Sequence, residues 1–457
     1  TPPWLQTTEP KTGSHRYQSP CPDCNQQLRD RIMGLCIGID LGTSGCRVIA
    51  IDEHAEEVST LTRPVPDSVS PAKGEQQQNP QDWWQAVTGL LQETVAKIGN
   101  KPVDAIAVDG TSSTLLLTDH QGTPLTPALM YNDSRSRDNL KLLKQVAPEG
   151  SPVLSASSSL AKLLHLSSNL NTDSYYALHQ ADWIMGRLTG NYRLSDENNA
   201  LKLGYDPISR QWPEWINTLN LDTNCLPEVH PCGTPVGKLS KDVAQATGLQ
   251  SGVTVVAGTT DSNAACLATG ANEIGDAVTS LGSTLVLKIL SDKPVFDSRY
   301  GIYSHRLGDR WLVGGASNSG GAVLRHYFKP NQLPGLTDAI QVNQPTGLDY
   351  YPLVSAGERF PINDPDLAPR LCPRPESDSL FFQAILEGIA EVEKQGYSQL
   401  MELGAPKPKK VFSIGGGAVN EPWRQMRELR LGVSVIRAVQ QEAAYGTALL
   451  ALRKIRY

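Results

Sequence analysis

The carboxylate best placed for acid–base chemistry in this sequence is Asp261, at the end of a hydroxyl-rich turn. An apolar run over residues 252–257 leads into Gly258-Thr259-Thr260-Asp261. Backbone N–H groups in such a turn can bind phosphate oxygens, and the carboxylate beside them can accept a proton from a nucleophile. Capping is the structural alternative, because Asp261 or Ser262 could start a helix over residues 263–268. The two roles are compatible, and we expect Asp261 to face a cleft.

Four further turns of similar composition follow strand-like runs elsewhere in the chain. They are Asp40-Leu41-Gly42-Thr43-Ser44-Gly45, Asp109-Gly110-Thr111-Ser112-Ser113, Leu281-Gly282-Ser283-Thr284 and Gly415-Gly416-Gly417-Ala418. Their glycines permit positive φ and a close approach of the backbone to a ligand. Taken singly, each turn could be an ordinary hairpin or strand-to-helix connection. Five such turns, shared between two halves of the chain, predict a phosphate-bearing nucleotide held between two lobes.

Short strands and one well-marked helix must position the turns of the first half. We expect three strands, a helix and a fourth strand at residues 35–40, 46–52, 58–62, 80–98 and 103–108. Asn79 suits the N-cap of the helix, Pro80 its first position and Gly99 its end. Three strands in a row before the helix indicate a mixed α/β domain, because a Rossmann fold alternates strand and helix strictly.

The second half repeats this arrangement. We expect strands at 253–257, 277–280, 285–290 and 410–414, and helices at 379–403 and 442–456. The chain therefore reads as two related α/β halves that meet near residue 250, with insertions at 140–245 and 325–378. We assign a disordered tail to residues 1–32, an N-terminal domain to 33–247 and a C-terminal domain to 248–457, with Met33 as a natural start.

Composition limits the partners and the compartment. The 457 residues are enough for two cores, and the net charge of -6 argues against nucleic acid. No apolar run reaches the roughly 18 residues of a membrane span. The scattered cysteines indicate a reducing compartment, so we expect a cytoplasmic protein, with the plastid stroma as the alternative. Cys21 and Cys24 form a single C-x-x-C motif, and the sequence nearby offers no further metal ligands.

Together these motifs resemble those of the FGGY carbohydrate kinases, from about Gly34 to Arg453. The matching segments are Gly38 to Ser44, Gly258 to Ser262, Leu281 to Thr284, Gly314 to Gly321, Gly415 to Asn420 and Glu442 to Gly446. The resemblance implies an α/β fold of two actin-like ATPase (ribonuclease H-like) domains with a cleft between them. It also implies ATP-dependent phosphorylation of a sugar hydroxyl, with Mg2+ as the metal and a small sugar and ATP as the partners.

The resemblance assigns roles to individual residues. Asp261 would be the general base, and Asp40, Ser112 and Asp261 would contact the sugar. ATP would lie against Thr43, Ser44, Gly282, Ser283, Thr284, Gly415, Gly416, Gly417 and Asn420. Mg2+ would be held by Asp40 and Asp261. Trp83, Trp84 and Trp183 are expected to pack in the core, and His165 and His230 are not expected to be ligands.

Departures from the family pattern concern the sugar side. Xylulokinases carry Met-His-Gly where this chain has Asp109 to Ser113, and the signature Lys162 is followed by His165 instead of tryptophan. Gln180 to Trp183 resembles a short pentulose-kinase branch of cyanobacteria and plant plastids that is associated with D-ribulose. D-ribulose is therefore the expected substrate. D-xylulose or another polyol is the alternative within enzymes, and a nucleotide-switched binding protein of the actin and Hsp70 type is the alternative outside them.

Overall fold

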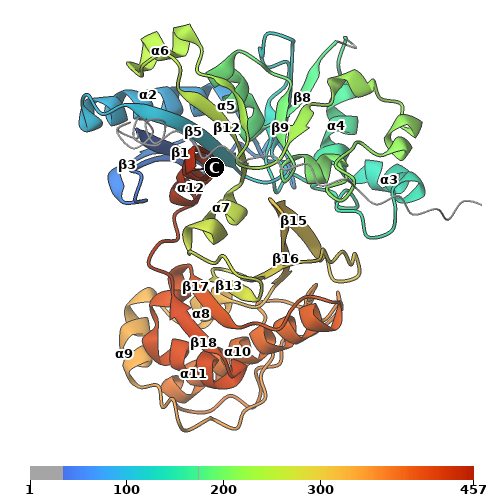
Figure 1. Cartoon of the computed structure of the whole chain (residues 1–457). Helices are drawn as coiled ribbons and strands as arrows, with labels where there is room; N and C mark the ends of the chain where they lie inside the picture. The colour runs from blue at the N-terminus through green and yellow to red at the C-terminus, as the bar shows by residue number, and fades with distance from the viewer. Residues whose placement is uncertain (1–33, 173, 457) are drawn as a thin grey trace, which may run out of the picture. The chain divides into compact units, whose positions relative to one another are not determined.

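The computed structural model describes residues 34–172 and 174–456 (Figure 1). The predicted tail over residues 1–32, Met33, and the Cys21–Cys24 pair lie outside the described residues. Within them, none of the helices combines the length and the hydropathy needed to cross a bilayer.

Six strands form the first sheet, in the order β11-β12-β5-β1-β2-β3. Their bounds are β1 Leu35–Leu41, β2 Gly45–Ile51, β3 Glu57–Pro64, β5 Val103–Gly110, β11 Pro235–Lys238 and β12 Thr254–Thr260. The first three strands and β5 confirm the expected order. The sheet also takes in β12, so it extends beyond residue 247, where we expected the first domain to end. Pairing partners are a tertiary property, and the local pattern around residue 250 did not reveal them.

The register of the parallel strands brings three turns to one edge of this sheet. Asp40 on β1 lies opposite Asp109 on β5, and Asp109 lies opposite Thr259 on β12. Because all three strands run in the same direction, the residues that follow them emerge on the same side. This edge therefore collects Asp40, Asp109 and the start of the helix after β12.

The first sheet is contacted by helices α2 (Pro80–Ile98), α5 (Gln180–Thr189), α7 (Asp261–Ala268) and α12 (Ala443–Arg456). The N-cap prediction for α2 is confirmed, since the Asn79 side chain accepts a hydrogen bond from the Gln81 N–H at 3.1 Å. Trp83 is completely buried on this helix, whereas Trp84, which we had also expected to pack in the core, is half-buried.

Helix α12 returns from the far end of the chain to the first sheet (Figure 1). Two glycines allow α12 to pack closely against β1 and α7. A Cβ atom on Gly38 of β1 would overlap the carbonyl oxygen of Ala444, and one on Gly446 would overlap that of Ala264 on α7 (Asp261–Ala268). The contact thus depends on bare backbone at both crossings.

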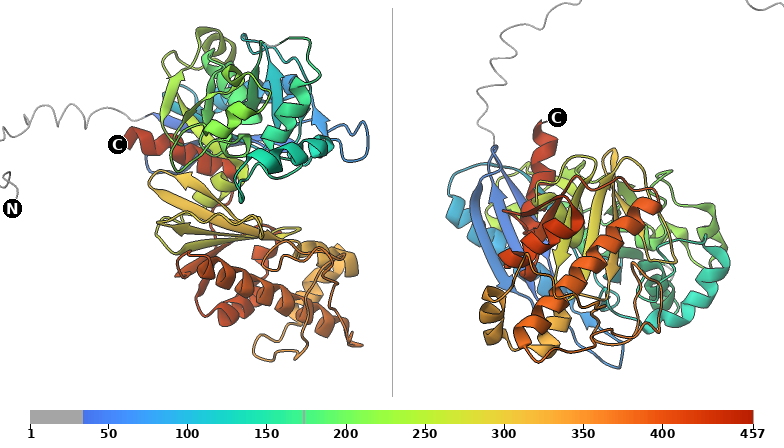
Figure 2. Two further views of the ribbon diagram at one scale, coloured as in Figure 1. Left: turned by 90° about the vertical axis from the view of Figure 1, so that its right-hand side faces the viewer. Right: turned by 90° about the horizontal axis from the view of Figure 1, so that it is seen from below.

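The second sheet has the order β15-β16-β14-β13-β17-β18. Its strands are β13 Asp276–Leu281, β14 Leu285–Ser291, β15 Tyr303–Leu307, β16 Arg310–Ser317, β17 Lys410–Ile414 and β18 Ser434–Arg437. The predicted hairpin between β13 and β14 is confirmed. Helices α8 (Gly321–Tyr327), α9 (Leu333–Asp338), α10 (Asp378–Glu402) and α11 (Glu421–Leu431) complete this half, and the long α10 runs along the second sheet (Figure 2).

A smaller sheet combines β4, which precedes β5, with strands that follow β5, and several helices accompany it. The sheet has the order β4-β7-β6-β8, with β4 Gln77–Gln78, β6 Leu115–Thr118, β7 Ala128–Leu129 and β8 Tyr176–His179. The remaining elements are α3 Leu140–Val146, α4 Ser159–Ser167, α6 Lys241–Thr247 and the paired strands β9 Leu194–Asp196 and β10 Glu228–His230. Apolar side chains of α4 and β6 share one buried cluster, so α4 is fixed close to the turn after β5.

Candidate active site

Three carboxylates meet at the edge of the first sheet. Asp40 and Asp109 end neighbouring strands, and Asp261 is the first residue of α7. Thr260, in an extended conformation, occupies the N-cap position, so the expected cap at Asp261 or Ser262 is one or two residues too late. The Asp261 Oδ1 accepts a hydrogen bond from the Ser262 N–H at 2.6 Å.

Burial raises the pKa of all three groups, and repulsion between carboxylates adds to the shift for Asp40 and Asp109. Burial raises the pKa of Asp40 to about 6; the neighbouring Asp109 carboxyl and the charge of Arg47 oppose the shift, and the charge of Asp261 adds to it. Burial and the charge of Asp40 raise the pKa of Asp109 well above its usual value. Burial also raises the pKa of Asp261, against the Ser262 N–H and the charges of Lys288 and Lys202.

Asp109 occupies the centre of this cluster and is tied to the last helix. Its Oδ2 accepts a hydrogen bond from the Thr447 hydroxyl of α12. Its Oδ1 is buried and has no hydrogen-bond partner among the described residues. A buried carboxylate oxygen without a partner is costly, and a nearby cation would satisfy it.

The carboxylates fit a magnesium ion that arrives with phosphate. No group of three or more His, Cys, Asp or Glu side chains is placed to hold a metal ion by itself within the described part of the chain. Mg2+ is commonly bound through one or two carboxylates, with waters and substrate phosphates completing its octahedron. The donor set here, hard oxygens of neighbouring carboxylates, suits that mode.

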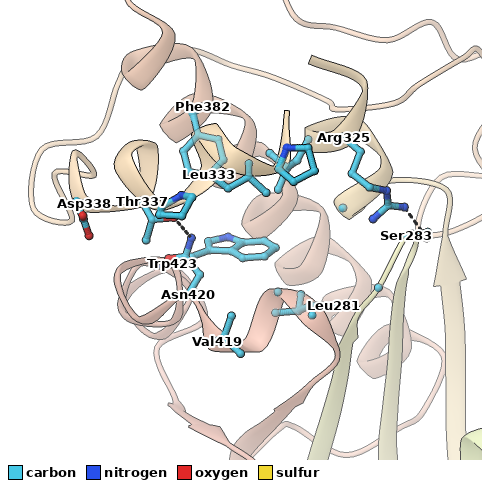
Figure 3. Close-up of a pocket in the computed structure, with 17 residues that line it drawn as sticks. Leu281, Ser283, Arg325, Leu333, Thr337, Asp338, Phe382, Val419, Asn420 and Trp423 are labelled. Carbon is cyan, nitrogen blue, oxygen red and sulfur yellow. Dashed lines mark hydrogen bonds between the residues drawn. The ribbon is translucent and has the colours of Figure 1, made fainter. Parts of the chain in front are cut away.

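A cavity of about 710 Å³ lies on the second half of the chain. Leu281, Gly282, Ser283, Gly321, Leu324, Arg325, Pro330, Leu333, Pro334, Thr337, Asp338, Phe382, Gly416, Gly417, Val419, Asn420 and Trp423 line it (Figure 3). Figure 3 shows Trp423, Leu333 and Phe382 around its middle and Arg325 near Ser283. The structure therefore brings Gly282, Ser283, Gly416, Gly417 and Asn420, all predicted ATP residues, together around one apolar cavity of a size suited to a nucleotide.

Polar contacts fix the walls of this cavity. The Asn420 Oδ1 accepts a hydrogen bond from the Trp423 N–H at 2.9 Å and so caps α11, and its Nδ2 donates to the Thr337 hydroxyl at 3.1 Å. Arg325 donates to the Ser283 Oγ at 2.6 Å. A Cβ atom on Gly417 would come within 2.8 Å of Leu281, so a larger residue there would crowd the turn.

The other predicted ATP residues lie outside the cavity lining. Thr284 and Gly415 each adjoin a lining residue in sequence but do not line the cavity themselves. Thr43 and Ser44 belong to the turn between β1 and β2 near Asp40. The Gln78 side chain binds the Thr43 carbonyl at 2.8 Å, and the Val65 N–H binds the Ser44 carbonyl at 3.0 Å.

The turn after β5 presents Ser112 while its neighbours are held. Gln180 Oε1 accepts hydrogen bonds from the N–H and hydroxyl of Thr111 at 3.0 and 2.9 Å. Buried Lys162 donates to the carbonyls of Ser113 and Met130 at 2.8 and 2.7 Å. Ser112 is half-buried, and its side chain makes no hydrogen bond within the described residues. Lys162, noticed in the sequence only as a signature residue, thus fixes the predicted sugar-side turn.

Two lysines beside Asp261 escaped the sequence reasoning. Lys288 on β14 is buried and donates to Ser262 Oγ and Asn263 Oδ1 at 3.0 and 2.7 Å. Lys202 lies with its Nζ 5.2 Å from the ring centroid of Tyr303. The available signal was a charged residue inside the apolar run of residues 285–290, where a strand buried on both faces rarely places one.

The remaining candidates are structural, as expected for the tryptophans. Trp83 and Trp183 pack edge to face with centroids 6.3 Å apart, and their indole N–H groups donate to Gln78 and the Gly122 carbonyl. Asp133 is buried and binds Arg135 and the Gln76 N–H.

The fold and the site define a sugar kinase. Residues 35–268 match the family model of the N-terminal domain of the FGGY family of carbohydrate kinases, and residues 277–455 match that of its C-terminal domain. The chain belongs to this family, and it is a phosphotransferase that acts on a carbohydrate.

Curated relatives and solved structures agree with this family. Xylulose kinase of Escherichia coli (strain K12) is 27% identical over 418 residues, which cover 85% of this chain and 83% of the relative. Xylulose kinase of Bacillus subtilis (strain 168) is 26% identical over 447 residues, with 92% and 88% covered. The xylulose kinase structure from Rhodospirillum rubrum superposes with a TM-score of 0.81 at 22% identity, covering 91% and 89%. Plasmodium falciparum glycerol kinase with ADP gives 0.82 at 18% identity, covering 93% and 90%. These likenesses confirm the predicted two-domain actin-like fold.

Proposed function

We propose that this kinase transfers the γ-phosphoryl group of ATP to the primary hydroxyl of a ketopentose, converting D-ribulose to D-ribulose 5-phosphate. The observation that carries the proposal is the double attachment of the β13–β14 hairpin. Gly282 and Ser283 in its turn line the cavity, and Lys288 on β14 contacts the first turn of α7. One rigid element thus links the nucleotide side to the carboxylate proposed as the base.

Asp261 is the proposed general base. As the sugar oxygen bonds to the γ-phosphorus and the bond from that phosphorus to the β-phosphate oxygen breaks, the hydroxyl proton passes to the Asp261 carboxylate. A loose transition state requires little proton removal early in the reaction, so a weak base is sufficient. Asp40 and Ser112 hold other hydroxyls of the sugar and orient it.

ATP and Mg2+ complete the proposed site. The adenosine occupies the cavity beside Gly415, Gly416, Gly417 and Asn420, and the phosphates lie against Gly282, Ser283, Thr284, Thr43 and Ser44. Asp40, with Asp261, holds the Mg2+, which when bound neutralises phosphate charge. The unpartnered oxygen of Asp109 supports a cation at this edge.

D-xylulose is the second candidate, because both bacterial relatives described above are named xylulose kinases. The residues from Asp109 to Ser113, which depart from the xylulokinase pattern, favour D-ribulose. Measuring ADP release with D-ribulose, D-xylulose, L-ribulose, glycerol and gluconate side by side tests the choice. We expect the highest kcat/KM with D-ribulose. A preference for D-xylulose would show that D-xylulose, not D-ribulose, is the substrate. ADP release that does not depend on any sugar would contradict sugar phosphorylation by this site.

Ser112→Ala is expected to raise KM for the sugar about 2- to 12-fold while the Kd for ATP changes less than about twofold. The reason is the loss of one hydrogen bond to a neutral hydroxyl, worth about 0.5–1.5 kcal/mol. Steady-state kinetics with varied sugar and isothermal titration with ATP measure the two values. The control is Ser157→Ala, which changes a serine of another turn that is half-buried like Ser112. Equal effects on sugar and ATP would place Ser112 outside the sugar site.

Activity is expected to fall as the pH is lowered through about 6. Burial raises the pKa of Asp40 to about 6, and the proposed role in holding Mg2+ requires its ionised form. This decrease at low pH should appear in kcat/KM for Mg·ATP, which reports the free enzyme, and it should disappear in Asp40→Asn. The sign for stability is opposite, because ionising a carboxyl whose folded pKa is raised costs stability as pH rises from about 4 to about 6. If the decrease at low pH persists unchanged in Asp40→Asn, another group is responsible for it.

A further inference from the structure

A buried lysine joins the second sheet to the helix that carries Asp261. Lys288 lies in the middle of β14, opposite Gly314 on β16. Its Nζ donates to Ser262 Oγ at 3.0 Å and to Asn263 Oδ1 at 2.7 Å. Both acceptors lie in the first turn of α7, immediately after Asp261. Lys288 is therefore hydrogen-bonded to the helical turn that carries the proposed base.

The same contact continues to the other side of Asp261. Asn263 donates through its Nδ2 to the Thr259 hydroxyl at 3.4 Å, and Asn198 donates to the same oxygen at 2.9 Å. Asn198 also accepts a hydrogen bond from the Arg306 N–H on β15 at 3.0 Å. Hydrogen bonds thus fix the residues before and after Asp261, and Lys288 and Asn198 connect them to strands of the second sheet.

The Lys288 side chain is buried in a closely packed part of the second sheet. The Lys288 side chain is only 7% exposed, and a Cβ atom on Gly314 would lie 3.1 Å from its Cγ. A buried charge is expensive unless it is paired or hydrogen-bonded, and an apolar residue at a core strand position avoids that cost. A lysine whose two side-chain hydrogen bonds both end beside one carboxylate suggests a task connected with that carboxylate.

Other charged groups surround the same turn. Lys202 acts on Asp261 from the first half of the chain, and Asp40 and Asp109 face it from β1 and β5. Buried His305 on β15 lies close enough to Lys288 and Lys202 that, after burial, their charges lower its pKa. Among these groups Lys288 alone donates hydrogen bonds to side chains of the first turn of α7, within the described residues.

We propose that Lys288 is a positioning residue for phosphoryl transfer: it fixes the first turn of α7 to the hairpin that lines the nucleotide cavity, and so keeps Asp261 in register with the phosphoryl donor. This inference rests on the proposed role of Asp261 as the base. The distance from Gly282 and Ser283, at the cavity, to Lys288 is a few residues of one continuous hairpin. Misplacement of a reacting group by about 1 Å can cost on the order of 10²-fold in rate.

Lys288→Met tests the proposal in the full chain. We expect kcat with the preferred sugar to fall about 10- to 100-fold, while KM for the sugar and the Kd for ATP each change less than about threefold. Lys288→Gln, which keeps an N–H donor of shorter reach, should lie between wild type and Lys288→Met. Lys410→Met is the matched control, because Lys410 is a lysine of the same sheet that pairs with Asp276 at 3.4 Å. It should keep wild-type kcat.

A double-mutant cycle with Asp261→Ala separates positioning from general damage. If Lys288 acts through Asp261, adding Lys288→Met to Asp261→Ala should lower the residual kcat less than about twofold, since groups that act as a unit are not additive. A full additional loss in that background, or wild-type kcat in both Lys288 variants, would overturn the inference. Wild-type turnover in Asp261→Ala alone would instead contradict the proposed base, so the two failures are distinguishable.

Discussion

Replacing Asp261 by alanine is expected to lower sugar-dependent turnover by about 10²- to 10⁴-fold, the usual contribution of a general base. The carboxylate is the first residue of α7, and the charges of Lys288 and Lys202 favour its ionised form. Alanine removes the proton acceptor and adds no bulk. Initial rates of ADP release at saturating sugar and ATP measure the loss.

The control for this change is another acid in the first turn of a helix. Asp242 in α6 is exposed and is none of the proposed ligand-binding residues, so Asp242→Ala should keep wild-type turnover. A negative charge in this position stabilises a helix by only about 0.3–1 kcal/mol, so both variants should bind ATP and unfold near the wild-type temperature. Turnover close to wild type in Asp261→Ala would remove Asp261 as the base.

Asp40→Ala is expected to weaken Mg·ATP use and sugar binding together. Asp40 is the proposed holder of Mg2+ through water, and loss of an outer-shell group typically costs about 10- to 100-fold in metal affinity. A Mg2+ titration at fixed ATP should show a half-saturating concentration raised by about that factor, and KM for the sugar should rise as well.

Stability separates this outcome from a simple turn role. Asp40 is half-buried beside the fully buried Asp109, and ionising both is unfavourable. Asp40→Ala removes one of the repelling charges, so in Mg2+-free buffer above pH 6 the melting temperature should not fall. A lower melting temperature with unchanged Mg2+ dependence and unchanged sugar KM would show that Asp40 only shapes the turn between β1 and β2.

Local sequence signals predicted the elements of this fold well. Asn79, Pro80 and Gly99 marked the ends of α2 because capping depends on the residues at the helix ends themselves. The β13–β14 hairpin and the glycine-rich turn after β17 were also predicted, because a turn depends on the residues within it. The N-cap of α7 was misplaced because Thr260, Asp261 and Ser262 are all capable of capping, and composition could not choose among them.

Pairings between distant segments could not be predicted from these signals. β12 joins the first sheet beside β5, although the sequence around residue 250 suggested the start of a second domain. The contacts of Lys288 with Ser262 and Asn263 cross 25 residues or more, and that of Thr447 with Asp109 crosses 338. Side chains brought together only by the assembled sheets leave no mark on local periodicity.

The return of α12 to β1 has a consequence for biosynthesis. A ribosome releases residues 35–110 long before residues 443–456, which pack against β1 and donate to Asp109 through Thr447. Until then the growing polypeptide must expose the apolar face formed by Cys36, Ile49 and Ala107, which α12 later covers. We therefore expect the emerging first half to need protection by chaperones, and to become resistant to proteases only after translation has passed the second sheet.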